Sequence, residues 1–289
     1  MRLFITGATG FIGSHVAAAA LAAGHEVIAL RHSGAMPRIM LPGRPTWIDG
    51  SLADLPPGAL AGCDVVIHLA AHGVTATRPA SWTECARINA EGTLHLLEHA
   101  RRAAVPRAIV AGSCFEYGRS AEAFDTVPVD APLAPVGAYA ASKAAASVLA
   151  LAWARTHGGQ LALLRPFMTY GEGEPAARLW PALCTAAMRG EDFPCTNGGQ
   201  VRDFIRVEAV ARTFLDAATA WTIGEGEPVI RNVGTGHARS VREFCTDAWT
   251  RLGARGQLRF GALPYRPDEV MRYVARLEPP VPMAHDIST

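Results

Sequence analysis

A tyrosine and a lysine four residues apart are the clearest candidates for chemistry in this sequence. Tyr139 and Lys143 open an alanine-rich stretch that predicts a helix to about residue 156, so both side chains project from one helix face. A neighbouring ammonium favours the phenolate form of tyrosine, which makes such a pair a proton donor and acceptor near neutral pH. Ser113, at the tip of a predicted strand at 105–111, is placed to hydrogen-bond the same substrate oxygen. Taken alone, the pair is also compatible with an ordinary exposed helix surface.

Three glycines near the N-terminus predict a site for a dinucleotide. A short apolar strand at 3–5 runs into Gly7, Gly10 and Gly13, and an alanine-rich helix follows to residue 23. Gly7 permits a tight turn, Gly10 leaves room for a pyrophosphate, and Gly13 lets the helix lie against the strand. The free N–H groups of the helix N-terminus then face the anion.

The first half of the chain alternates apolar strands with helical stretches, which predicts an α/β fold with a Rossmann-type, doubly wound parallel sheet. Further strands are expected at 26–30, 47–48, 64–71, 105–111 and 161–164. We therefore expect a dinucleotide-binding domain at 1–167. Residues 168–289 form shorter pieces and predict a smaller C-terminal substrate-binding lobe, with segments around 200–236 returning to the main domain.

The end of the second predicted strand bears on the choice of cofactor. An acidic residue here commonly binds the ribose hydroxyls of the adenosine, whereas Arg31, followed by His32 and Ser33, could pair with a 2′-phosphate. This substitution predicts NADP(H) as the preferred cofactor and leaves NAD(H) possible. The alternative is a solvated arginine at a strand end. Ser51, after the third predicted strand, is placed beside the adenine.

Composition limits the partners. Lys and Arg number 27 and Asp and Glu 26, a net charge of +1, so neither nucleic acid nor a membrane surface is an expected partner. The six cysteines form no CxxC pair and there is no His-rich metal spacing, so a reduced chain without a metal site is expected. The longest apolar run is too short to span a bilayer, and we expect a cytoplasmic protein.

These motifs together resemble the extended short-chain dehydrogenase/reductase family, the group of nucleotide-sugar epimerases, dehydratases and 4-ketoreductases. The resemblance is carried by TGATGFIG at 6–13, DVVIHLAA at 64–71, the segment around Asn89, SCFEYG at 113–118, YAASK at 139–143, RPF at 165–167, RDFI at 202–205 and NVGTG at 232–236. It implies a catalytic triad of Ser113, Tyr139 and Lys143, with Tyr139 as the general acid and base.

The resemblance also implies contacts to cofactor and substrate. Cofactor contacts would come from Phe11, Ile12, Leu69, Ala70, Ala71, Asn89, Pro166 and Phe167. Arg202 and Arg266 match places where relatives bind the diphosphate of a nucleotide sugar, although salt bridges within the lobe are an equal alternative. Thr75, Phe193 and Glu174 are further candidates for substrate contact, and an ordinary loop position is the alternative for each.

Three departures from the family pattern narrow the reaction. Dehydratases carry Asp-Glu directly after the triad serine or threonine, where this chain has Cys114 and Phe115, which cannot both abstract and return protons. The 3,5-epimerase/reductase branch places a cysteine two residues before the tyrosine of that loop, whereas Cys114 stands three before Tyr117, and it needs a histidine that 168–181 lacks. The 4-epimerases keep an acid where Arg31 stands.

We therefore expect an NADPH-dependent reductase of a nucleotide-activated 4-keto-(di)deoxysugar, with hydride passing to C4 and Tyr139 donating the proton. The alternatives are a nucleotide-sugar 4-epimerase that retains NAD, a dinucleotide sensor with a vestigial triad, and a reductase of a carbonyl compound without a nucleotide. The family suggests a homodimer through the helices near 85–101 and 140–156; packing within one subunit explains their alanine-rich faces equally well.

Overall fold

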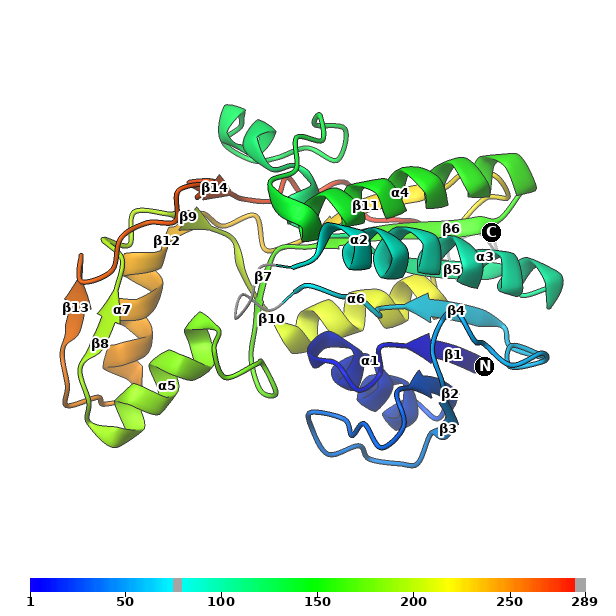
Figure 1. Cartoon of the computed structure of the whole chain (residues 1–289), viewed down its shortest axis with the longest axis horizontal. Helices are drawn as coiled ribbons and strands as arrows, with labels where there is room; N and C mark the ends of the chain where they lie inside the picture. The colour runs from blue at the N-terminus through cyan, green and yellow to red at the C-terminus, as the bar shows by residue number, and fades with distance from the viewer. Residues whose placement is uncertain (75–79, 284–289) are drawn as a thin grey trace.

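A parallel sheet of seven strands forms the centre of the protein (Figure 1). The computed structural model describes residues 1–74 and 80–283, so the candidate substrate contact Thr75 lies outside the described residues. The strand order is β11-β6-β5-β4-β1-β2-β3, with a crossover at β1. The strands are β1 (Arg2–Thr6), β2 (Glu26–Arg31), β3 (Thr46–Asp49), β4 (Val65–His68), β5 (Arg107–Ala111), β6 (Gln160–Pro166) and β11 (Val229–Val233). The expected Rossmann-type α/β fold is confirmed.

Helices cover both faces of this sheet, which explains why its central strands are continuous apolar runs. On one face α1 (Phe11–Ala22) packs against α6 (Val207–Thr219). On the other lie α3 (Gly92–Arg102) and α4 (Gly137–His157), as Figure 1 shows. All four residues of β4 are buried, and so are the last four of β1. Because the strands are parallel, their carboxyl ends meet at one edge of the sheet, next to the smaller lobe.

The helix expected at 82–104 is interrupted. The chain forms α2 (Trp82–Cys85), then a π-helical turn η1 (Ala86–Glu91), and only then α3. Within the π turn the amide of Asn89 bonds the backbone N–H and C=O of His72 at 2.7 and 3.0 Å and also the hydroxyl of Ser142 at 2.8 Å. These contacts join three separate elements, and a π turn commonly marks such a functional constraint.

The smaller lobe has its own aromatic core. Its helices are α5 (Leu179–Arg189) and α7 (Val241–Arg251), and β8 (Phe193–Cys195) pairs with β13 (Leu258–Phe260) beside them (Figure 1). The rings of Phe204 and Phe244 stack at 3.9 Å, and Tyr170 and Trp180 meet them edge-on. Tyr170 belongs to β7 (Met168–Tyr170), which pairs with β10 (Phe204–Arg206) where the lobe joins the main sheet.

The single strand suggested for 200–205 is two short strands in different sheets. β9 (Val201–Arg202) pairs with β12 (Arg239–Ser240) and β14 (Arg272–Tyr273), whereas β10 turns towards β7. Asp203 stands between them, fully buried. Its carboxylate accepts hydrogen bonds from the backbone of Thr235, Gly236 and Ala275, so it fixes the point at which the two sheets separate.

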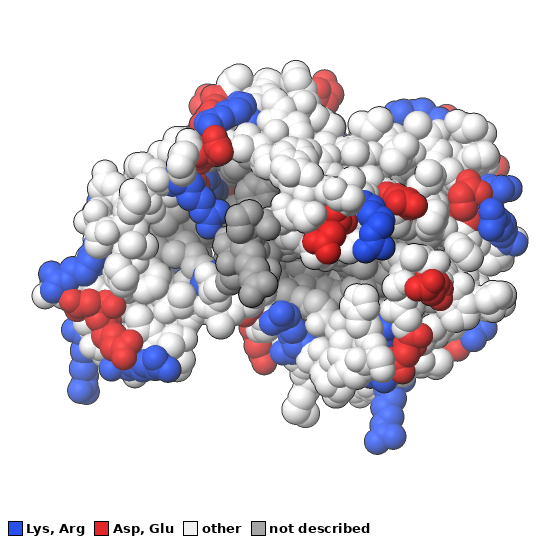
Figure 2. All heavy atoms as spheres, viewed as in Figure 1, with Lys and Arg blue, Asp and Glu red and all other residues white. Residues whose placement is uncertain are grey.

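The surface carries charges of both signs. Figure 2 shows Lys and Arg side chains interspersed with Asp and Glu across the face in view, without a broad area of one sign. Among the described residues, no helix has the length and apolar character needed to cross a membrane. In the same residues no three His, Cys, Asp or Glu side chains are grouped as a metal site would require. All six cysteines are free thiols.

Candidate active site

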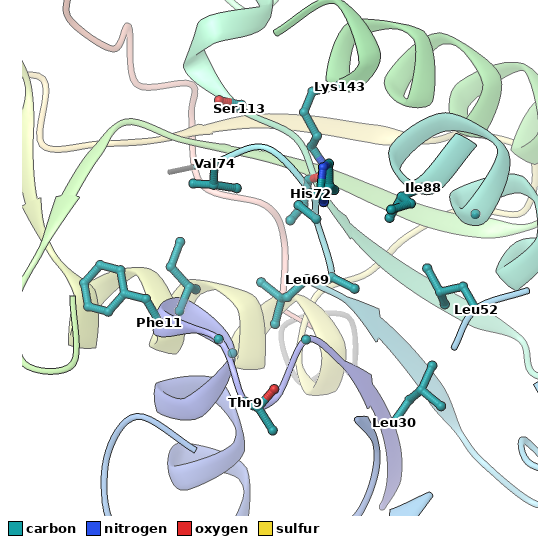
Figure 3. A pocket seen from close by; sticks show the side chains of 18 of the residues that line it. Thr9, Phe11, Leu30, Leu52, Leu69, His72, Val74, Ile88, Ser113 and Lys143 are labelled. Carbon is teal, nitrogen blue, oxygen red and sulfur yellow. The ribbon is translucent and has the colours of Figure 1, made fainter. Parts of the chain in front are cut away.

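A cavity of about 690 Å³ opens at the carboxyl ends of the sheet strands, where open α/β sheets bind ligands (Figure 3). It is continuous from the glycine loop to the start of α4. Most of the residues singled out from the sequence line it: Gly7, Gly10, Phe11, Ile12, Gly13, Arg31, His32, Ser51, Leu69, Ala70, Ala71, Ser113, Tyr139, Lys143, Pro166 and Phe167. One cavity thus brings together the expected cofactor and catalytic groups.

The glycine loop is held by close backbone contacts that leave no room for side chains at Gly7 and Gly13. Gly7 has φ +73°, and a Cβ there would stand 2.6 Å from the backbone nitrogen of Ala70. A Cβ on Gly13 would lie 2.0 Å from the carbonyl oxygen of Gly7, so any side chain would push α1 away from the loop. These contacts leave the N-terminus of α1 facing the cavity, which is the arrangement that binds a dinucleotide phosphate.

A buried histidine ties the glycine loop to the far wall of the cavity. His68, at the end of β4, lies between the hydroxyls of Thr6 (Nδ1 to Oγ1, 2.7 Å) and Thr93 (Nε2 to Oγ1, 2.9 Å). Thr93 donates its own proton to the carbonyl of Asn89, so its oxygen accepts from His68 Nε2–H, and Nδ1 accepts from Thr6. Burial lowers the pKa of His68 to about 3 and keeps it neutral.

Ser113, Tyr139 and Lys143 form one wall of the cavity. Ser113 follows β5 and caps a short 3-10 turn, η2 (Cys114–Glu116), while Tyr139 and Lys143 occupy the first turns of α4. The side chain of Ser113 lies close enough to Tyr139 to lower the pKa of the phenol. Lys143 is buried and its Nζ donates to the carbonyl of Ala111 at the end of β5. The strand end and the helix start therefore hold all three groups against each other.

The pKa shift of Tyr139 is opposite to the one that the sequence predicts. We expected the ammonium of Lys143 to bring the pKa of Tyr139 towards neutrality. Burial instead raises the pKa of Tyr139, and the hydrogen bond with Ser113 and the charge of Arg178 oppose that rise. Burial also lowers the pKa of Lys143, which the nearby carboxylate of Glu116 counteracts. Tyr139 therefore keeps its proton unless a further positive charge stands beside it.

Glu116 supports this wall from behind and was not anticipated as a site residue. It is fully buried; one carboxylate oxygen accepts from the backbone N–H of Ser113 at 2.7 Å and the other pairs with Arg165 Nε at 2.8 Å. Arg165 also donates to the hydroxyl of Tyr117 at 2.9 Å, and that hydroxyl donates to Asn232 at 2.7 Å. This paired network fixes the turn that carries Ser113.

Arg31 has a partner that the sequence did not reveal. Its Nε donates to the carboxylate of Asp49 at 2.7 Å, and its guanidinium lies 4.8 Å from the ring centre of Trp47. Arg31 and Asp49 are register partners in the parallel pair β2 and β3. This pairing weakens the preference for NADP that Arg31 predicts, because a carboxylate already neutralises the cation.

The cavity is nevertheless cationic. Arg38, Arg87 and Arg178 line it together with Arg31 and Lys143, and Glu91 is the one carboxylate among its described lining residues. Such a lining suits two polyphosphate ligands. Arg38, Arg87 and Arg178 were missed, because they lie in irregular or helical segments whose spacing carries no phosphate-binding signal.

Several expected residues do not line the cavity. Ser33 is exposed, and the side-chain amide of Asn89 is hydrogen-bonded to the backbone of His72 and the hydroxyl of Ser142. Phe193 packs against Trp249 in the lobe core, with ring centres 6.3 Å apart.

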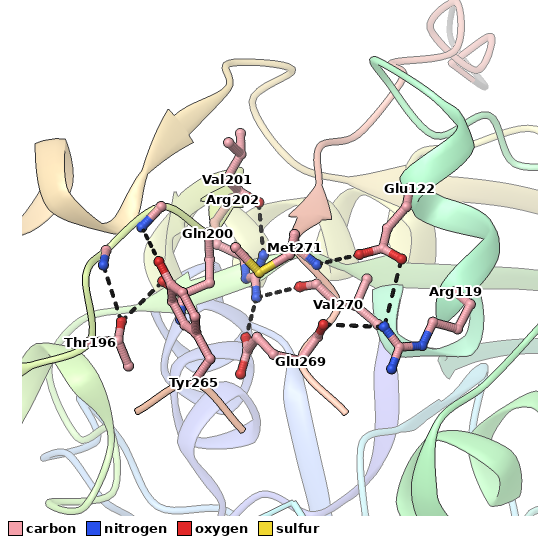
Figure 4. A network of polar contacts seen from close by, with 12 residues as sticks. Arg119, Glu122, Thr196, Gln200, Val201, Arg202, Tyr265, Glu269, Val270 and Met271 are labelled. Carbon is pink, nitrogen blue, oxygen red and sulfur yellow. Dashed lines mark hydrogen bonds and ion pairs between the residues drawn. The ribbon is translucent and has the colours of Figure 1, made fainter. Parts of the chain in front are cut away.

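The two arginines expected at a substrate diphosphate are also apart from the cavity lining. Arg202 is buried and donates to Glu269 at 2.6 Å and to the carbonyl of Val270 at 2.8 Å (Figure 4). Arg266 lies on the exposed loop that precedes Glu269. Of the two readings left open from the sequence, the structure therefore shows for Arg202 the salt bridge within the lobe.

The residues after Ser113 offer no acid–base pair. Cys114 is buried, and burial raises the pKa of its thiol to about 12. Phe115 packs edge-on against Tyr273 at 5.4 Å between ring centres. A thiol that stays protonated and a phenyl ring can neither remove nor return a proton at carbon.

The sequence of this chain is similar to a known family and to several enzymes that act on nucleotide sugars. The model of the "NAD dependent epimerase/dehydratase family" matches residues 3–234. A dTDP-glucose 4,6-dehydratase of Streptomyces niveus is 33% identical over 94% of this chain and 84% of its own. A UDP-glucose 4-epimerase of Corynebacterium glutamicum is 27% identical over 84% of this chain and 78% of its own.

Among solved structures, MoeE5 in complex with UDP-glucuronic acid and NAD is similar throughout. It is 30% identical, with a TM-score of 0.81, over 96% of this chain and 90% of that chain. The similarity extends over both the sheet and the smaller lobe.

Proposed function

The chain belongs to the NAD-dependent epimerase/dehydratase family of extended short-chain dehydrogenases/reductases, and from that premise we propose that it is a nucleotide-sugar 4-epimerase that retains NAD. The observation that carries the proposal is the single wall of Ser113, Tyr139 and Lys143 facing the glycine loop across one cavity. One acid–base group and one redox cofactor suffice for oxidation and reduction at the same carbon. Dehydration needs a further acid–base pair, which Cys114 and Phe115 do not supply.

The residues of the triad have separate roles in this reaction. Ser113 orients the 4-oxygen of the sugar, and Tyr139 takes the hydroxyl proton as the C–H bond at C4 breaks. A bound NAD would supply the hydride acceptor for C4, and the positive charge of its oxidised ring would lower the pKa of the Tyr139 phenol. After the keto sugar has turned its other face, Tyr139 returns the proton to O4. Lys143 stabilises the phenolate stage from one helical turn away.

The segment between β7 and α5 favours retention of the cofactor. The carbonyl of Glu172 is hydrogen-bonded with Nε2 of His15 on α1 at 2.9 Å. A Cβ on Gly173 would lie 3.0 Å from Cβ of Arg38, so the two backbones are in close contact. The lobe is thus tied to the helix whose N-terminus faces the pyrophosphate. This connection supports a cofactor that stays bound between turnovers.

NAD is the form that we propose. The pairing of Arg31 with Asp49 supports it, and MoeE5, at 30% identity, was solved with NAD. The decisive experiment is to denature the purified protein and identify the released dinucleotide, then to follow the interconversion of 4-epimeric nucleotide sugars by proton NMR without added cofactor. Tyr139→Phe should abolish the interconversion while the dinucleotide stays bound. Undiminished interconversion in that variant would contradict the proposal.

An NADPH-dependent 4-ketoreductase is the second candidate. Arg31, His32 and Arg38 line the cavity, and among the described residues only Arg31 of these three has a carboxylate partner, Asp49. Three basic groups there favour a 2′-phosphate. Consumption of added NADPH with a nucleotide-linked 4-keto-(di)deoxysugar, and no epimer interconversion, would establish this candidate in place of the epimerase.

We also propose a homodimer through α3 and α4. Apolar side chains remain exposed on α4, Val148 by 57% and Leu149 by 39%, and at the start of the neighbouring α2, Trp82 by 65%. A second copy packed against α4 would bury apolar surface that is exposed in one copy, which supports a two-fold interface.

A further inference from the structure

A glutamate and a histidine one helical turn apart line the cavity and have no part in the proposed reaction. Glu91 is the last residue of η1, His95 lies in the first turn of α3, and the backbone at Glu91 is helical, so both side chains project from one face. His95 Nε2 and Glu91 Oε1 are 3.8 Å apart. The pair therefore presents a hydrogen-bond acceptor and an N–H donor side by side to the cavity.

The carboxylate of Glu91 differs in charge from the rest of the lining. Glu91 is the one carboxylate among the described residues that line the cavity, whereas four arginines and Lys143 also line it. A carboxylate repels the phosphates that these cations suit. The ligand group that Glu91 meets is therefore a neutral hydrogen-bond donor rather than a phosphate.

Apolar side chains form a slot beside this pair. Leu30 lies near the end of β2, Leu52 follows β3 and Ile88 belongs to η1, and all three line the cavity. Figure 3 shows them on the opposite side of the pocket from Phe11. A Cβ on Gly92 would lie 3.1 Å from Cδ1 of Leu52, so the start of α3 is in contact with the wall that follows β3. A slot with such walls suits the apolar faces of a flat ring.

The order of groups along the cavity indicates which ring enters the slot. The glycine loop serves the phosphates, and the wall of Ser113, Tyr139 and Lys143 is where the nicotinamide meets the sugar. The adenosine half is left for the other end, at the ends of β2 and β3. One edge of adenine carries the 6-amino donor beside the N7 acceptor. Glu91 and His95 offer the complementary acceptor and donor at a matching spacing of 3.8 Å.

We propose that Glu91 and His95 bind this edge of the adenine and make the protein specific for adenine dinucleotides. A carboxylate oxygen of Glu91 accepts a hydrogen bond from the 6-amino group, and a ring N–H of His95 donates to N7. The inference rests on the proposed function in one respect, which is that a dinucleotide occupies the cavity. It applies to NAD and NADP alike, because both carry the same base.

The test compares two dinucleotides that differ at the edge of the purine. NAD has an amino group at the 6-position, and nicotinamide hypoxanthine dinucleotide has a carbonyl oxygen there. Protein stripped of bound nucleotide is titrated with each by calorimetry, as the wild type, Glu91→Ala, Glu91→Gln and His95→Ala. His157→Ala is the matched control, because it breaks a pair with Glu98 that also spans 3.8 Å and does not line the cavity. Urea unfolding shows whether each variant is folded.

We expect the wild type to bind NAD roughly tenfold more tightly than the hypoxanthine compound, since the carbonyl oxygen offers Glu91 no proton. Glu91→Ala should lose this preference through weaker binding of NAD, and Glu91→Gln, whose amide oxygen still accepts, should keep part of it. His95→Ala should weaken both dinucleotides by a similar factor, because N7 is common to both. His157→Ala should behave as the wild type.

The possible failures separate this inference from the proposed function. Equal affinities of the wild type for the two dinucleotides, an unchanged preference in Glu91→Ala, or unchanged affinities in His95→Ala would overturn the inference alone. A folded wild type that binds neither dinucleotide would overturn the proposed function as well.

Discussion

The carboxylate of Glu116 accepts a hydrogen bond of 2.7 Å from the backbone N–H of Ser113. Ser113 in turn caps the same turn through its hydroxyl, which accepts from Phe115 N–H at 3.2 Å. A buried carboxylate thus fixes the turn on which the Ser113 hydroxyl lies. That charge is balanced by Arg165, whose Nε is 2.8 Å away, and it also acts on Lys143.

Replacement of Glu116 by glutamine should destabilise the protein and disturb catalysis together. Glutamine keeps an acceptor for Ser113 N–H but leaves the buried guanidinium of Arg165 without a counter-charge, which costs roughly 3 kcal/mol. Urea denaturation should report that loss, and the pH profile of turnover should shift because the charge that raises the pKa of Lys143 is gone. Glu225→Gln, at an exposed position, is the control. Equal stability of the two variants would contradict the buried ion pair.

The buried His68 should make the protein lose stability in acid. Its pKa is about 3 in the folded chain, whereas an ordinary solvated histidine has a pKa of 6.5. Below pH 6.5 the unfolded state binds a proton that the folded state refuses, so this contribution is complete above 6.5 and falls by about 1.4 kcal/mol for each pH unit down to 3. In urea unfolding between pH 4 and 7, His68→Gln should remove this slope and the exposed His237→Gln should keep it. An unchanged slope in His68→Gln would show that other groups cause it.

Freeing Arg31 should change the cofactor preference. In the wild type we expect tighter binding of NAD than of NADP, because Asp49 occupies the guanidinium. Asp49→Ala should raise the affinity for NADP roughly tenfold, since an unpaired arginine gains a charged contact with the 2′-phosphate. Calorimetry with both dinucleotides on protein stripped of bound nucleotide measures this change. Adding Arg31→Ala should reverse it, and a wild type that already prefers NADP would refute the prediction.

A charge on the exposed face of α4 should separate the proposed dimer. Val148→Glu places a carboxylate on α4 at an exposed apolar position next to Leu149, and sedimentation velocity should then show monomers. Leu263→Glu introduces the same charge at a similarly exposed apolar residue in the lobe and should leave the dimer intact. A wild type that sediments as a monomer at micromolar concentration would rule the interface out.

Local patterns were sufficient to predict the core of the fold. Buried parallel strands are continuous apolar runs, and the spacing of Gly7, Gly10 and Gly13 between a strand and a helix predicts a close backbone approach. Tyr139 and Lys143 share a helix face by spacing alone. The cavity that joins these pieces follows from the sheet, because the carboxyl ends of parallel strands meet at one edge.

The pairings between distant residues could not be predicted in this way. Arg165 is 49 residues from Glu116, and Asp49 meets Arg31 only through the register of β2 and β3. Arg202 was a candidate for a phosphate, yet its partner Glu269 is 67 residues away on an irregular segment. Each of these pairs forms because two distant segments lie side by side in the fold. Hydrophobic periodicity predicts the individual segments but not which of them are neighbours.

The π turn at 86–91 also restricts how this enzyme can vary. An α-helix advances about 100° per residue, so removal of one residue from the turn would give a regular helix but rotate everything on one side of it by that angle. Either the hydrogen bonds between Asn89 and His72 or the hydrogen bond between Thr93 and His68 would break. This helix would then no longer be held at its place beside the cavity. Substitutions can accumulate in this helix, but its length cannot change by a single residue.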